Sequence, residues 1–126
     1  MINDEVGGNY SGGASIANGQ SISVNITLSK DVNVGLAVFK VRHTGASDIN
    51  MNNAHWIVTG LIDTSWEYAG GLEIFVGKTW DSSATATALL YNVKAGTYTV
   101  TFTNNTGATT NPTYNSAVSV KVIRLC

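Results

Sequence analysis

The segment between His55 and Asp81 gathers the aromatic and acidic side chains that are best suited to ligand binding. It holds all three tryptophans and four of the eight acidic residues of the chain: Trp56, Trp66, Trp80, Asp63, Glu67, Glu73 and Asp81. A flat aromatic ring stacks on the apolar C–H face of a sugar, while a carboxylate accepts hydrogen bonds from its hydroxyl groups. Trp56 lies inside an expected strand, which favours a core position, whereas the other two tryptophans lie close to expected turns. The predicted ligand-binding residues are therefore Trp66, Glu67, Tyr68, Trp80 and Asp81.

Catalytic chemistry has weaker support than binding. Glycoside hydrolysis needs two carboxyl groups about 5 Å or about 6.5–9.5 Å apart around the scissile bond, and no spacing in the sequence indicates such a pair. His43 and His55 have no nucleophile motif around a serine, and the single cysteine, Cys126, lacks an activating neighbour. No glycine-rich phosphate loop leads from a strand into a helix. We therefore expect a protein without catalytic residues.

One short run has the oxygen-bearing side chains that Ca²⁺ prefers. Asp48, Asn50 and Asn52 alternate with other residues, but the bend glycine and the bidentate glutamate of an EF-hand loop are missing. An asparagine-rich turn that bonds its own backbone is the preferred interpretation. No cofactor is predicted, and a Ca²⁺ site at these three residues is the weaker alternative.

The composition limits the classes of partner that the chain can bind. The chain has 126 residues, which corresponds to one domain, with 12% charged residues and a net charge of −1. Such a surface does not favour nucleic acid or anionic lipid. No apolar stretch approaches the ~20 residues that span a bilayer, and residues 1–13 lack the pattern of a signal peptide. We expect no nucleic-acid partner, no membrane insertion and assembly in the cytoplasm.

Hydrophobic periodicity predicts the elements that must position these residues. Apolar residues alternate with polar ones from Ser21 to Leu28, as in a half-buried strand. Further strands are expected at residues 32–41, 55–62, 65–68, 72–76, 86–93, 97–103 and 117–125. About eight strands without a helical period predict an all-β, two-sheet antiparallel sandwich, either a jelly roll or an Ig-like Greek key. Residues 1–19 are predicted to form a flexible or extended N-terminal arm, and residues 20–126 a single sandwich domain.

The same alternation predicts the core. The residues expected to be buried are Ile22, Val24, Ile26, Leu36, Val38, Tyr98, Val100, Phe102, Val118, Val120 and Val122. The threonines at 97, 99, 101 and 103 are expected on the solvated face of their strand. Residues 32–41 are apolar on both faces, and Ala117, Ile123 and Leu125 lie on the second face of the last strand. This surplus of apolar positions predicts a homo-oligomer, because obligate interfaces resemble a core cut in half.

The passage LLYNVKAGTYTVTFTNNTG (Leu89–Gly107) resembles the late hairpin of many bacterial and phage β-sandwich modules, in which AGTY marks the crossing between sheets and the tyrosine packs inward. The Ser/Thr/Asn/Gly-rich composition resembles that of bacteriophage virion-surface proteins, namely head fibres, decoration proteins and tail-fibre tips. This resemblance implies a structural protein of the virion surface, a trimer by preference, with other virion proteins and host-surface glycans as partners. It assigns no functional residue. The alternative is a lectin-like carbohydrate-binding module.

Overall fold

The computed structural model describes residues 4–10, 15–44, 52–62, 70–78, 81–110 and 118–126, and all statements on structure refer to them. Within these ranges the chain forms eight strands and no helix. The strands are β1 (Asp4–Asn9), β2 (Ser21–Leu28), β3 (Val32–Thr44), β4 (His55–Thr59), β5 (Leu72–Phe75), β6 (Asp81–Val93), β7 (Gly96–Asn105) and β8 (Val118–Arg124). The predicted all-β class is confirmed. The strand expected at residues 65–68 lies outside the described residues.

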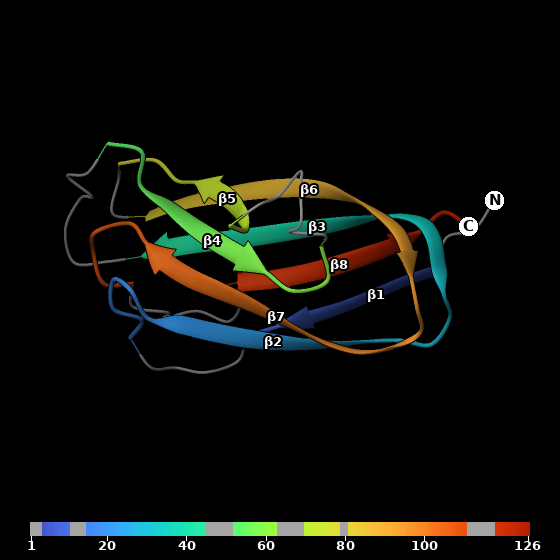
Figure 1. Cartoon of the computed structure of the whole chain (residues 1–126). Helices are drawn as coiled ribbons and strands as arrows, with labels where there is room; N and C mark the ends of the chain where they lie inside the picture. Colours follow the sequence, from blue (N-terminus) through green and yellow to red (C-terminus); the bar gives the residue numbers. More distant parts are fainter. Residues whose placement is uncertain (1–3, 11–14, 45–51, 63–69, 79–80, 111–117) are drawn as a thin grey trace.

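The strands form two four-stranded antiparallel sheets that pack face to face (Figure 1). The first sheet has the order β1-β8-β3-β6 and the second the order β2-β7-β4-β5. This interleaved order, in which every pair of successive strands except β4 and β5 is divided between the two sheets, is that of a jelly roll. It decides between the two predicted topologies. The chain crosses from β6 to β7 at the AGTY segment, and Tyr98 packs against the core there, as the resemblance implied.

The core lies between the two sheets and follows the alternation of the sequence. Eight of the predicted core residues are buried: Ile22, Val24, Ile26, Val100, Phe102, Val118, Val120 and Val122. Tyr98 is half-buried. The prediction is wrong for Leu36 and Val38, which lie on the outer face of β3, while Ala37, Phe39 and Val41 point inward. Because both faces of β3 are apolar, its own pattern does not indicate which face is inside.

The N-terminal segment contributes to the sandwich. Strand β1 pairs with β8 from Asp4 opposite Arg124 to Asn9 opposite Ser119. Ile16 is fully buried and forms a two-way backbone bridge with Thr110. A Cβ atom at Gly8 would lie 2.9 Å from the carbonyl oxygen of Asn25, so a glycine there lets the edge of the first sheet approach β2. The described parts of residues 1–19 therefore belong to the sandwich and not to a separate arm.

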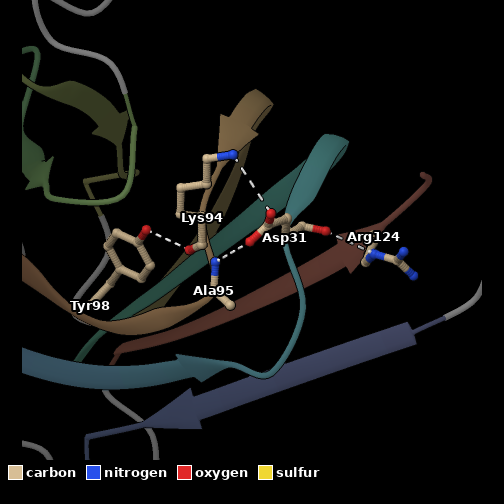
Figure 2. A network of polar contacts seen from close by, with 5 residues as sticks. All are labelled: Asp31, Lys94, Ala95, Tyr98 and Arg124. Atoms are coloured by element: carbon tan, nitrogen blue, oxygen red, sulfur yellow. Dashed lines mark hydrogen bonds and ion pairs between the residues drawn. The ribbon is translucent and has the colours of Figure 1, made fainter.

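A polar network joins two connections and the end of β8 at one end of the sandwich (Figure 2). Asp31 accepts a hydrogen bond from the Ala95 amide at 2.8 Å and lies 3.6 Å from the Lys94 ammonium. Its backbone carbonyl accepts a bond from Arg124 Nε at 3.0 Å. The Tyr98 hydroxyl donates to the carbonyl of Lys94 at 2.6 Å. The amide of Ala95, helped by Lys94, lowers the pKa of Asp31. The network fixes the β6–β7 crossing against the start of β3.

Buried polar groups occupy the opposite end of β3. Asn104 is fully buried; its amide donates to the carbonyls of Ile16 and Ala108, and its Oδ1 accepts from the amide and hydroxyl of Thr106. His43 Nδ1 is hydrogen-bonded to the Thr110 hydroxyl, but His43 Nε2 has no partner among the residues that the structure describes. Burial lowers the pKa of His43 below its ordinary value of 6.5. The imidazole is therefore held neutral inside the fold.

Truncation of the core tests the assigned register. Val100 is fully buried and lies opposite Val24 on β2, so Val100→Ala should lower the free energy of unfolding by about 1–3 kcal/mol in urea titrations. Thr85→Ala, an exposed position on β6, is the matched control and should change it by less than about 0.5 kcal/mol. Equal effects of the two substitutions would contradict the register.

The buried imidazole predicts a pH dependence. The native pKa of His43 is lowered, so its contribution to stability is complete above about pH 6.5 and is lost as the pH falls further, because the unfolded chain binds the proton more readily. The slope is at most about 1.4 kcal/mol per pH unit, the limit for one proton. Urea midpoints measured from pH 8 to pH 5 should fall for the native chain and fall less for His43→Leu. Parallel curves would contradict this. Asp31 and Asp81 titrate below that window, since their pKa values are lowered from 3.8.

Candidate functional site

The predicted ligand-binding residues are described only in part. Trp66, Glu67, Tyr68 and Trp80 lie outside the described residues. Asp81 begins β6, where its two oxygens accept hydrogen bonds from Arg42 Nε at 3.0 Å and Nη2 at 2.9 Å. This hydrogen bonding lowers the pKa of Asp81. The carboxylate is therefore held in a bidentate ion pair on the outer face of the first sheet.

The residues of the alternative Ca²⁺ site are also described only in part. Asp48 and Asn50 of the alternative Ca²⁺ site lie outside the described residues, and Asn52 is exposed. In the described part of the chain, no three side chains of His, Cys, Asp or Glu come together as a metal site would require. No helix in these ranges is long and apolar enough to cross a membrane. Trp56, expected in the core, is fully buried on β4.

The outer face of the second sheet is polar. Hydroxyl and amide groups of β2 and β7 bond each other across the strands, as Ser21–Thr103 at 2.7 Å, Ser23–Thr101 at 3.3 Å, Asn25–Thr99 at 3.0 Å and Thr27–Thr97 at 3.0 Å. The predicted solvated threonine face is confirmed, with exposed or half-buried side chains along its length. The cross-strand bonds form a ladder that fixes the rotamers of the row.

Beside this ladder, three neighbouring strands bring together an aromatic ring, an imidazole and an amide. His55 on β4 lies opposite Phe75 on β5 and opposite Asn105 on β7. The His55 and Phe75 rings are 5.3 Å apart at 45°, and Phe75 is 53% exposed. Glu73 is the next residue on the same face of β5, two positions before Phe75, and its carboxylate lies 3.8 Å from His55 Nε2. We refer to Phe75, His55, Glu73 and Asn105 as the Phe75 row.

Hydrogen bonds fix the imidazole of the Phe75 row. His55 Nδ1 lies 2.7 Å from the carbonyl oxygen of Asn53, which can only accept, so Nδ1 carries the proton. Nε2 is then the acceptor for the Asn105 amide at 3.0 Å. This arrangement leaves Asn105 Oδ1 as a further acceptor. The Glu73 oxygens belong to a side chain that is 54% exposed. Only the strand register reveals this set, because the other three members lie 18 to 50 positions from His55 in sequence.

The outer face of the first sheet is apolar over three strands. Leu36 on β3 lies between Leu89 on β6 and Ile123 on β8. The adjoining positions are also apolar, and the set comprises Val34, Leu36, Val38, Leu89, Tyr91, Ile123 and Leu125. Tyr91 is 60% exposed, Leu89 48% and Leu125 41%, whereas the other four are half-buried. We refer to these seven residues as the apolar face.

A pocket of about 180 Å³ lies near the network of Figure 2. Its apolar lining comes from β1, β2, β3 and β8, and Lys30 and Arg124 add positive charge. The complete lining consists of Val6, Thr27, Leu28, Ser29, Lys30, Val32, Val122 and Arg124. Arg124 is already bonded to the Asp31 carbonyl, and both cations have further interactions. Asp81, the predicted ligand-binding residue that the structure describes, does not line this pocket.

Comparison with known proteins shows which solved structures share this fold. No protein-family model matches the chain, and no curated protein matches it. Among solved structures, murine APRIL is 9% identical, with 98% of this chain and 100% of that chain aligned at a TM-score of 0.56. Eiger TNF from S. frugiperda is 10% identical, with 100% and 94% aligned at a TM-score of 0.53.

A third similar structure is a β-porphyranase of glycoside hydrolase family 86 from the human gut bacterium Bacteroides plebeius. It is 13% identical over 98% of this chain at a TM-score of 0.55. The chain spans only 20% of that enzyme, and 18% of another family 86 protein. At these identities the similarity concerns the fold alone. The chain is therefore a jelly-roll β-sandwich of a kind found both as an entire chain and as one part of much larger enzymes.

Proposed function

We propose that this protein is a non-enzymatic assembly module that associates with copies of itself through the apolar face. The observation that carries the proposal is the exposure of Leu89, Tyr91 and Leu125 beside four half-buried aliphatic residues on one sheet. Single exposed apolar residues are ordinary, but a contiguous group across three strands is typical of an interaction surface. Covering such area is worth about 25 cal/mol per Å².

The size and charge of this face fit a second copy of the chain. Four strands about 4.8 Å apart, the longest of 13 residues, give the whole outer face at most roughly 800 Å², about what each partner buries in an interface of standard size. Lys40, Arg42 and Lys121 lie toward one end of it and the apolar residues toward the other. The apolar residues therefore form one continuous part of the face, and charged residues are depleted from the centre of interfaces in the same way.

Strand β6 supports the same proposal. It forms the edge of the first sheet and has 13 residues. Natural proteins protect long edge strands with lysine, proline or a bulge. Between Ser82 and Val93 the sequence has neither a charged residue nor a proline. An edge of this composition is suited to being covered in an assembly.

The setting that we propose is the surface of a virion, assembled in the host cytoplasm, with a trimer as the expected oligomer. The sequence resemblance to phage fibre, decoration and tail-tip proteins supports this. The non-enzymatic character is supported by the carboxylates of Asp31 and Asp81, which serve as structural hydrogen-bond acceptors at opposite ends of the first sheet. Loops and the polar second sheet would then face outward to bind other molecules.

Assembly is tested by mass in solution. Light scattering coupled to size exclusion, between about 1 and 200 μM, should show an oligomer for the native chain. The double variant Leu89→Asp/Tyr91→Asp should be folded and monomeric, because two buried, unpaired carboxylates in an interface cost several kcal/mol. Thr59→Asp, an exposed position on the second sheet, is the control and should leave the mass unchanged. A native chain that stays monomeric at 200 μM overturns the proposal.

A further inference from the structure

Within the described part of the chain, no core contact explains the exposed aromatic ring and carboxylate of the Phe75 row. Phe75 and Glu73 are both more than half exposed at the edge strand β5. Ile74, between them, is buried, and with Leu72 it packs against the core. On β4, the same face carries the half-buried His55 and Ile57. The row thus combines an open aromatic surface, an apolar floor and fixed polar groups.

We propose that the Phe75 row binds a neutral saccharide. The exposed ring of Phe75 offers a surface for the C–H face of a sugar, as aromatic side chains do for flat apolar surfaces. The Glu73 oxygens accept hydrogen bonds from sugar hydroxyls, and charge-assisted bonds of this kind are the stronger ones. Asn105 adds a carbonyl oxygen and an amide group on the far side of His55.

The site is fixed before a ligand arrives. His55 is held by the Asn53 carbonyl at 2.7 Å and by the Asn105 amide at 3.0 Å, and the Thr103 hydroxyl next along β7 is held by Ser21 at 2.7 Å. Side chains that are already ordered lose less conformational entropy on binding. From Phe75 to Asn105 the row crosses two strand spacings, about 10 Å, which is room for about two linked sugar rings.

Charge selects among the ligands that such groups could take. Glu73 is the acidic member of the row, and its exposed carboxylate repels an acidic sugar. A cation would also suit an aromatic ring beside a carboxylate. However, the row also has the Asn105 side-chain amide, which both donates and accepts, and its groups are spread along about 10 Å. This spread matches several hydroxyl groups better than one positive charge.

The test is a titration of the full-length protein followed by backbone amide shifts in NMR. The probes are neutral gluco-, galacto-, manno- and xylo-oligosaccharides in α and β linkage, polygalacturonate fragments, and tetramethylammonium as the cation. We expect at least one neutral oligosaccharide to shift His55, Phe75 and Asn105, with a dissociation constant of the order of 1 mM for so shallow a site. Polygalacturonate fragments should not bind there.

Variants separate the outcomes. Phe75→Ala should weaken saccharide binding about tenfold, Glu73→Gln should weaken it severalfold while retaining part of it, and Thr85→Ala on the other sheet should not change it. Three results overturn the proposal: no shift with any neutral saccharide at 10 mM, shifts that Phe75→Ala leaves intact, or preferential binding of tetramethylammonium that Glu73→Gln abolishes. The last result would make the row a cation site.

Discussion

Strand β3 is paired with a strand along each edge and is apolar on both faces. What covers the inner and the outer face of the first sheet therefore depends on it. Its inward residues Ala37, Phe39 and Val41 fill the core between the sheets. Its outward residues Val34, Leu36 and Val38 meet equally apolar neighbours on β6 and β8. A strand with one polar face would have made this an ordinary solvated sheet. The physical problem that the sequence poses is therefore what covers the second apolar surface.

The fold was predictable where one face of a strand is clearly polar. The alternation of Ile22, Val24 and Ile26 with serine and asparagine determines the inner face of β2, and the threonines of β7 do the same for their strand. The alternation does not determine the inner face of β3, so Leu36 and Val38 were assigned to the core wrongly. The sequence did not predict strand β1, because DEVGGN has no alternating pattern and only one strand-forming residue, Val6. The strand owes its conformation to backbone pairing with β8.

The candidate site was less predictable, for a different reason. The tryptophans near turns predict a site at Trp66 and Trp80. Among the described residues of the second sheet, the exposed aromatic residue is Phe75. His55 and Glu73 lie in the segment that the sequence analysis singled out, but Asn105 is 50 positions from His55. Side chains meet across strands according to register, and register depends on the turns and on the packing of the whole sandwich. A pattern within one segment does not contain that information.

Association through the apolar face would affect how strongly the Phe75 row binds a ligand. The apolar face and the Phe75 row lie on opposite outer surfaces of the sandwich, on different sheets. Association through the apolar face therefore leaves one Phe75 row open on every copy. An exposed row that crosses only three strands binds a single saccharide weakly, because few groups are removed from water. Several rows on one rigid particle act at a high effective concentration on a polymeric ligand, and avidity then exceeds the affinity of one row by a factor of about 100 or more. Self-association would thus convert a weak site into an effective one without any additional contact in the site itself.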